Sequence, residues 1–238
     1  MLLRVLSSTS SAIASGGPSV DAITLYKGVG FQELGPLSRF IYFHSTRALI
    51  HTVMKGLPGA STIAQVVNPV ARSYYRLRAP ASSSTLKFRA VSQFSKELDT
   101  LLLARNDDHT VRLTADLNWI LKYSKSITAY EISDGNNLVG YCLIHSENRK
   151  ATSFHRRLPS MLVASLLDYY IKDRSAANLR QLVAFAINGS RKLFADVLEI
   201  QSNKSDVNAC LNQFGFIRAG GNKVLLRPPP GTVLNRDH

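Results

Sequence analysis

Residues with catalytic or metal-binding chemistry are few in this chain, and most lack the spacing that such chemistry needs. The six histidines show no HExxH or similar ligand spacing, which predicts no zinc site. The only cysteines, Cys142 and Cys210, stand outside any CxxC pair, a pattern that fits a reducing compartment. No GxxxxGK[ST] loop is present, and Gly28, Gly30 and Gly35 have the wrong spacing for GxGxxG. The sequence therefore gives no sign of metal chemistry or of a P-loop.

One short phrase occurs twice. Residues 25–35 read Leu-Tyr-Lys-Gly-Val-Gly-Phe-Gln-Glu-Leu-Gly, and residues 210–220 read Cys-Leu-Asn-Gln-Phe-Gly-Phe-Ile-Arg-Ala-Gly. Each phrase indicates a helix that ends at a Gly-Phe pair and passes directly into a strand, because glycine tolerates the left-handed backbone at a helix C-terminus. The repetition predicts two copies of one module, of which the first is cut short at its front.

Positive charge is concentrated in one part of the chain, whose net charge is +13. No acidic residue occurs between Glu33 and Glu97, and nine basic residues lie there: Arg39, Arg47, Lys55, Arg72, Arg76, Arg78, Lys87, Arg89 and Lys96. Such a block favours an anionic partner, namely nucleic acid, an acidic membrane surface or an acidic substrate; alternatively it is a solvated basic face without a partner. Nucleic acid is disfavoured as the partner, because no known nucleic-acid-binding motif is present.

The N-terminal segment allows two interpretations. Residues 1–17 are rich in serine and lack acidic residues, which is typical of an organellar transit peptide. We favour a folded strand over residues 2–6, because the repeated phrase needs a strand and a helix before it. We therefore expect a cytoplasmic protein, or an organellar one if residues 1–17 are a transit peptide. No apolar run approaches the roughly 18 to 20 residues of a membrane-spanning helix.

Pattern and composition divide the chain into four regions. Residues 1–43 predict strand, loop, helix, strand and strand, and residues 44–85 predict a basic helical connector that ends in a Pro- and Ser-rich linker. Residues 86–228 predict an α/β domain, and residues 229–238 a flexible tail. The expected order from residue 86 is strand, helix, helix, strand, strand, strand, helix, strand, helix, strand, strand.

Local signals define several of these elements. A tight Asp-Gly turn at residues 134–137 predicts a β-hairpin. Residues 161–171 are apolar enough to form a buried strand or a helix, and residues 173–194 predict a long amphipathic helix. Trp119, the only tryptophan, is expected to anchor the core.

This order of elements, with Gly-Phe after the last helix, resembles the GNAT acyltransferase family over residues 86–228. Residues 1–43 resemble the last third of the same module. The whole chain is thus similar to a tandem GNAT protein whose first copy has lost its front half. The resemblance implies an α/β (α+β) fold with a mixed central sheet flanked by helices, preceded by a partial half-module.

The resemblance also implies a site for acyl-CoA. The family binds the pyrophosphate on backbone N–H groups at a helix start, with the phrase Arg or Gln, two residues, Gly, one residue, then Gly or Ala. Lys172, Ser175 and Ala177 fall on this pattern, and Asn178 follows them. Ser175 replaces the glycine and Asp173 adds a negative charge, so the alternative is an ordinary helix start capped by Asp173.

The catalytic residues implied by the resemblance are divided between the two copies. The family often uses a tyrosine four residues before the Gly of Gly-Phe to protonate the leaving thiolate. Tyr26 occupies that place in the first copy and Leu211, which cannot donate a proton, in the second. A general base would be a carboxylate on the strand before the long helix. Asp168 is the candidate there, with Glu199 on the next strand as the second choice.

Two functions remain open at this point. The first is an N-acyltransferase that uses acetyl-CoA or another acyl-CoA, needs no metal, and acylates a small-molecule amine or a sugar-linked acceptor. The second is a catalytically inactive GNAT-like module that contacts an anionic partner or membrane surface through its basic connector. An exposed sheet edge in the half-module would favour a homo-oligomer.

Overall fold

A computed structural model describes residues 13–16, 20–28, 31–44, 85–104, 113–149 and 161–227. The predicted strand at residues 2–6, nearly all of the connector and the tail lie outside these ranges. The chain forms two compact units. The smaller comprises Met1–Arg39, Gln201–Lys204 and Arg218–His238, and the larger Phe40–Ile200 and Ser205–Ile217. The predicted division at residues 43, 85 and 228 stays a prediction.

The smaller unit contains β1 (Ile13–Gly16), α2 (Val20–Gly28) and most of β2 (Gln32–Phe43) and β8 (Ile217–Arg227). Its strand order is β1-β8-β2, and β1 runs antiparallel to β8. Two short strands were expected after each Gly-Phe pair, and this was wrong, because β2 and β8 are each continuous. The glycine at the end of each phrase, Gly35 or Gly220, does not end the strand. Gly220 has φ 91° within β8 and bends the strand locally.

The larger unit holds the remaining elements and also the C-terminal residues of β2, Phe40–Phe43. These elements are β3 (Leu86–Val91), α5 (Glu97–Leu103), α6 (Thr114–Tyr123), β4 (Ile127–Asp134), β5 (Asn137–Arg149), β6 (Met161–Ile171), α7 (Ala176–Lys192), β7 (Val197–Ser202) and α8 (Ser205–Gln213). Its strand order is β2-β7-β6-β5-β4-β3. Strands β3 to β6 pair antiparallel, whereas β6 and β7 pair parallel. The predicted mixed sheet is confirmed, as is the element order from residue 86 as far as the last helix, and residues 161–171 form a strand.

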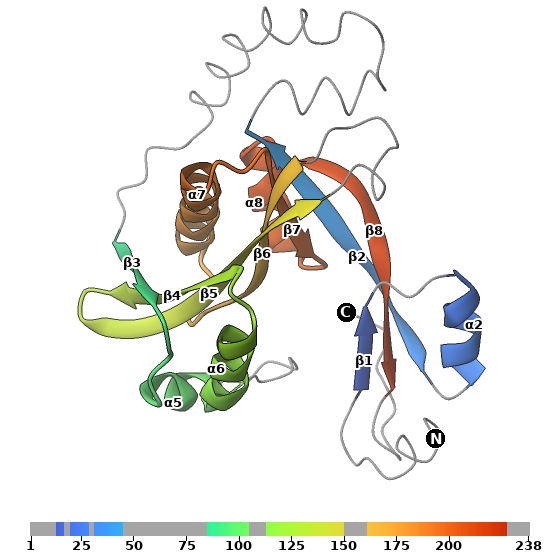
Figure 1. The fold of residues 1–238 in the computed structure, drawn as a ribbon, viewed down its shortest axis with the longest axis horizontal. Helices are drawn as coiled ribbons and strands as arrows, with labels where there is room; N and C mark the ends of the chain where they lie inside the picture. Colours follow the sequence, from blue (N-terminus) through green and yellow to red (C-terminus); the bar gives the residue numbers. More distant parts are fainter. Residues whose placement is uncertain are drawn as a thin grey trace, which may run out of the picture. The chain divides into compact units, whose positions relative to one another are not determined.

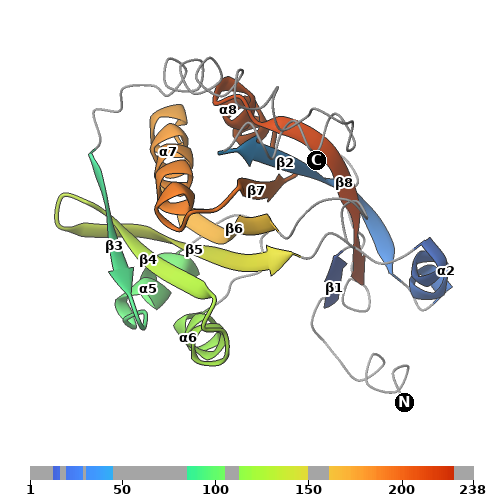
Figure 2. The same ribbon diagram turned by 45° about the horizontal axis from the view of Figure 1, so that its top comes forward.

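Helices cover both faces of the sheet in the larger unit, with α7 and α8 on one face and α5 and α6 on the other (Figures 1 and 2). The predicted apolar stripe of α7 is buried through Leu179, Leu182, Val183, Ala186 and Ile187. It packs against a core that includes Val207 and Leu211 of α8. Each of these two helices therefore buries one apolar stripe in the core.

The face of α5 and α6 has a core of its own. Leu98 and Leu102 of α5 and Leu117 of α6 are fully buried and pack with Tyr141 and Leu143 of β5. Residues 141 and 143 therefore point to this face, because side chains alternate along a strand.

Two local predictions have opposite outcomes. The hairpin is confirmed: Asp134 pairs with Asn137, and Gly135 has the positive φ of 59° that its two-residue turn requires. The expectation that Trp119 anchors the core is wrong, because its side chain is 64% exposed on the outer face of α6. In this helix Leu117 occupies the core position instead.

Candidate functional site

Strands β6 and β7 pair over only a short length, and this opens the sheet. The ladder runs from Val163↔Val197 to Leu166↔Ile200, and within the described strands it goes no further. At the same level β6 carries a bulge, because Ile144 of β5 pairs with Leu166 and Leu143 pairs with Asp168. Leu167 is thus the extra residue, and a bulge turns the strand away from its neighbour. The described parts of β6 and β7 therefore diverge from Leu167 onward.

The loop after β6 leads directly to the start of α7. The Lys172 N–H donates to the Val139 carbonyl (2.8 Å), which holds the end of β6 against β5. Ser175 is the N-cap, and its hydroxyl accepts from the Asn178 N–H at 3.4 Å. The helix begins at Ala176, three residues later than predicted. Lys172, Ser175, Ala177 and Asn178 thus lie together in one loop and helical turn, and their role in binding CoA stays a prediction.

Asp173 occupies part of this helix start. Its Oδ1 accepts from the Ser175 N–H (3.0 Å), and the Asn178 side-chain amide donates to its carbonyl oxygen (3.0 Å) and to Oδ2 (3.1 Å). Its carboxylate therefore already satisfies one of the N–H groups that would face an anion. Asp173 does not serve as the N-cap that the alternative interpretation required, because that position belongs to Ser175.

The next two amides of the helix start remain open. Ala176 and Ala177 are exposed, and no acceptor among the described residues takes up their N–H groups. The first N–H groups of a helix have no partner within it and carry the positive end of the helix dipole. The start of α7 can therefore accept an anion at two amides, beside the negative charge of Asp173.

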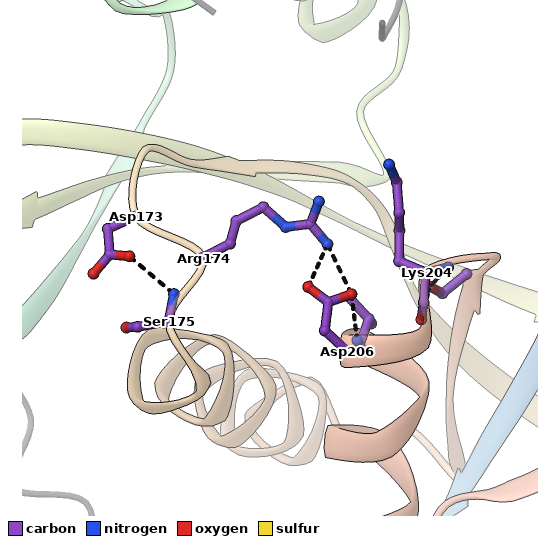
Figure 3. Close-up of polar contacts among 7 residues, drawn as sticks. Asp173, Arg174, Ser175, Lys204 and Asp206 are labelled. Atoms are coloured by element: carbon purple, nitrogen blue, oxygen red, sulfur yellow. Dashed lines mark hydrogen bonds and ion pairs between the residues drawn. The ribbon is translucent and has the colours of Figure 1, made fainter. Parts of the chain in front are cut away.

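An ion pair joins the starts of α7 and α8. The Arg174 guanidinium donates to both oxygens of Asp206, at 3.0 and 2.8 Å (Figure 3). Asp206 also accepts from the Val207 N–H (2.8 Å) at the beginning of α8. Sequence reasoning missed both Arg174 and Asp206, since nothing in the local pattern links two residues 32 positions apart.

The predicted base, Asp168, is half-buried on the face of α5 and α6. The Tyr141 hydroxyl donates to its Oδ2 at 2.9 Å, and the ring of Tyr141 meets the edge of Phe94. Tyr141 is buried, so the phenol is fixed and directs the carboxylate. No local sequence pattern indicates this contact, which depends on how β5 and β6 pair.

The predicted acid, Tyr26, belongs to the smaller unit. Its carbonyl accepts from the Phe31 N–H (3.1 Å), and the two rings meet edge to face at 5.0 Å. Leu211 accepts in the same way from the Phe216 N–H (3.1 Å), and its side chain is fully buried. The two repeated phrases therefore end their helices with the same backbone hydrogen bond, and the role of Tyr26 stays a prediction.

Glu199, the second-choice base, is engaged in an ion pair. Arg149 Nη1 donates to Glu199 Oε2 at 2.8 Å, and Arg149 Nε donates to Glu147. Burial acts to lower the pKa of Arg149, but its hydrogen bonds to Glu147 and Glu199 outweigh burial and raise that pKa. Glu199 is thus half of a buried charge pair, with a side chain only 4% exposed.

Two classes of site find no support in the described part of the chain. No group of three or more His, Cys, Asp or Glu side chains is arranged there to hold a metal ion. None of its helices combines the length and the apolar character needed to cross a membrane.

Comparison with known proteins places the fold. No protein-family model and no curated protein matches the sequence. A GCN5-related N-acetyltransferase from Anabaena variabilis aligns over 94% of this chain and 48% of its own, with TM-score 0.56 and 12% identity. N-myristoyltransferase from Saccharomyces cerevisiae, solved with myristoyl-CoA, aligns over 83% of this chain and 50% of its own, with TM-score 0.53 and 15% identity. A conserved protein of unknown function from Staphylococcus epidermidis aligns over 95% and 76%, with TM-score 0.52 and 11% identity.

The chain thus spans about half the length of this N-acetyltransferase and of N-myristoyltransferase. At such low identities the likeness concerns the fold alone. The chain has the fold of the GCN5-related N-acetyltransferases.

Proposed function

We propose that this protein is an acyl-CoA-dependent N-acyltransferase, with acetyl-CoA or another acyl-CoA as its co-substrate. The observation that carries the proposal is the β6-β7 ladder, which ends at Leu166 just ahead of an α7 start with two open amides. An opened strand and a helix N-terminus together suit a long ligand with amide groups at one end and phosphates at the other.

In this proposal the start of α7 binds the pyrophosphate. The N–H groups of Ala176 and Ala177 donate to the phosphate oxygens, and Lys172 adds a positive charge beside them. Ser175 and Asn178 shape the turn through their mutual hydrogen bond. Asp173 opposes binding by its charge, so the affinity is set by the balance between the helix start and this carboxylate.

The reacting thioester lies near the bulge at Leu167. The described β6-β7 ladder has ended there, so we assign to the Leu167 N–H the role of stabilising the oxyanion that forms when the amine attacks the carbonyl. Asp168, one residue further and directed by Tyr141, is the proposed general base. It accepts the proton that the acceptor nitrogen loses as the new C–N bond forms. The C–S bond of the thioester then breaks, and CoA leaves as a thiolate that takes up a proton from water.

We also propose that residues 1–43 belong to another copy of the same module. The same bond, from the N–H of Phe31 to Tyr26 and of Phe216 to Leu211, supports this. In both cases the phenylalanine follows the glycine at the helix end and leads into a strand, β2 or β8. The two phrases thus share local backbone geometry as well as amino-acid sequence.

Calorimetric titration with acetyl-CoA and with free CoA tests the proposed function. The wild type is expected to bind both, and Ser175→Glu is expected to abolish binding, because a carboxylate there repels the pyrophosphate. Asp134→Glu, a conservative change in the β4-β5 hairpin, serves as the control and should leave affinity unchanged. Absence of heat at millimolar CoA, or unchanged binding by Ser175→Glu, would contradict the proposal.

A further inference from the structure

Two helices on opposite faces of the sheet end at the same end of the larger unit (Figures 1 and 2). Helix α6 ends at Tyr123 and leads into β4, which begins beside the second half of β5. Helix α7 ends at Lys192, and the Asp196 N–H that follows it donates to the Leu162 carbonyl at the start of β6. Because the end of β5 pairs with the start of β6, both helix C-termini lie at one end of the sheet.

An exposed phenylalanine follows the last turn of α7. Phe194 is 88% exposed, and its φ of 56° is one that a bulky residue rarely adopts. Glycine would relieve the backbone strain, and a polar residue would avoid the exposure of an aromatic ring to water. Folding therefore does not account for a phenylalanine at this position, and such an unusual backbone conformation often marks a functional residue.

The end of α6 exposes a second aromatic group. Tyr123 is 66% exposed, and Trp119, one turn before it, is 64% exposed. Their ring centroids lie 5.2 Å apart, and Lys122 Nζ lies 5.4 Å from the centroid of the Tyr123 ring. Isolated apolar residues are ordinary on a protein surface, whereas aromatic groups gathered at one end of a sheet indicate an interaction surface.

Positive charge flanks these rings. Four exposed basic side chains lie at the two helix ends: Lys122, Lys125, Arg191 and Lys192. None of the four forms an ion pair with a carboxylate in the described part of the chain. The half-buried carboxylates at this end, Glu147 and Asp196, accept hydrogen bonds from Arg149 and from the Leu162 N–H. Cations near a helix C-terminus offset the helix dipole, which accounts for the basic residues but not for the rings.

We propose that the C-terminal ends of α6 and α7 form a docking surface for an anionic phospholipid membrane. Phe194 and Tyr123 enter the headgroup layer, and the four basic side chains contact the lipid phosphates. The two rings lie on opposite faces of the sheet, so a broad flat surface can meet both, whereas a nucleic-acid strand stacks on successive rings along one groove. The start of α7 lies at the other end of that helix, so docking leaves it uncovered.

Co-sedimentation of the full chain with lipid vesicles tests the surface. We expect binding to phosphatidylcholine vesicles that contain about 30% phosphatidylserine, and little binding to pure phosphatidylcholine. Phe194→Ala should lower the partition coefficient roughly fivefold, and Lys192→Gln should lower it by a similar factor. The matched controls are Leu103→Ala, which removes an exposed apolar side chain of α5, and Lys87→Gln, which removes an exposed charge of β3. Neither control should change the partition coefficient.

Two further readouts separate contact at this surface from other causes. Trp119 is the only tryptophan, so its emission should move to shorter wavelength when anionic vesicles are added, because they cover the outer face of α6. Thermal unfolding of Phe194→Ala should have the wild-type midpoint, because the ring is exposed. A clear fall in that midpoint would show that the ring serves folding and would overturn its role in docking.

The remaining outcomes decide between this surface and its alternatives. Equal binding to neutral and anionic vesicles, or unchanged binding by Phe194→Ala, would overturn the proposal. Vesicle binding without a change in Trp119 emission would place the contact elsewhere on the chain, and equal losses in both controls would show unspecific attraction of a chain with net charge +13. Binding of single-stranded RNA but not of vesicles, weakened in Phe194→Ala, would identify a nucleic-acid surface instead.

Discussion

Phe194 holds a backbone conformation that few side chains adopt. It has φ 56° at the end of α7, where its N–H donates to Arg191 and the Ala195 N–H donates to Ser190. Glycine normally occupies this position at the end of a helix, and Phe194 is 88% exposed. We expect Phe194→Gly to raise the free energy of unfolding by about 1 kcal/mol, measured by urea denaturation. Phe194→Ala keeps the Cβ atom and should gain nothing; equal gains in both variants would refute the strain.

His44 is held neutral by its surroundings. Ser190 donates its own hydroxyl proton to the carbonyls of Ala186 and Ile187, so His44 Nε2 must donate to Ser190 Oγ (2.7 Å). Nδ1 is then the unprotonated nitrogen, buried without a partner among the described residues. Burial, and then the charge of Arg191, lower the pKa of His44 to about 4.

This lowered pKa makes stability depend on pH in a defined direction. Between pH 6.5 and pH 4 the unfolded chain binds a proton at His44 and the folded chain does not. The contribution of neutral His44 to the free energy of unfolding is complete above pH 6.5 and is lost as pH falls toward 4. The free energy of unfolding should therefore fall by about 2 kcal/mol from pH 7 to pH 5. Urea unfolding at both pH values should show a smaller loss for His44→Gln. Parallel losses in the two proteins would rule out His44 as the source.

The outer face of α6 presents aromatic rings to solvent. Trp119 and Tyr123 are 64% and 66% exposed, and their ring centroids lie 5.2 Å apart. Because Trp119 is the only tryptophan, its fluorescence in the folded chain should resemble that of tryptophan in water. Trp119→Ala should change the free energy of unfolding by less than about 0.5 kcal/mol. Leu117→Ala, in the same helix, should cost about 2–5 kcal/mol. A costly Trp119→Ala would contradict this packing of α6.

In the proposed CoA site, the loop between β6 and α7 should set the affinity for the pyrophosphate. Asp173 places a carboxylate beside the open amides of Ala176 and Ala177. We expect Asp173→Asn to raise CoA affinity roughly two- to fivefold, because the change removes the charge and keeps an acceptor for the Ser175 N–H. The gain should shrink at high salt. Asp134→Asn, in the distant hairpin, is the matched control, and an equal gain there would point to net charge alone.

At the scale of the whole molecule, short-range patterns predicted the fold well. The element order from residue 86, the Asp-Gly hairpin and the apolar stripe of α7 all depend on residues close in sequence, so periodicity and turn chemistry reveal them. A break was predicted within β2 and within β8, and both strands are continuous. The prediction failed because a glycine in a strand pattern does not distinguish a turn from a bend.

Contacts between distant residues were not predictable. Arg174 with Asp206 and Tyr141 with Asp168 depend on strand register and helix placement, which leave no local pattern. The shared end of α6 and α7 is likewise visible only once β4, β5 and β6 are aligned. The position of a candidate site could therefore be predicted from the helix start, but its partners could not.

Acyl-CoA binding at the start of α7 can be followed directly by amide NMR of the labelled chain titrated with CoA. The amides of Ala176 and Ala177 should shift most, with smaller shifts at Leu167 and Asp168 and none in the hairpin at Gly135. Saturation should occur at one CoA per chain. An absence of shifts at residues 172–178 under millimolar CoA, or shifts confined to other parts of the chain, would contradict acyl-CoA binding at the start of α7.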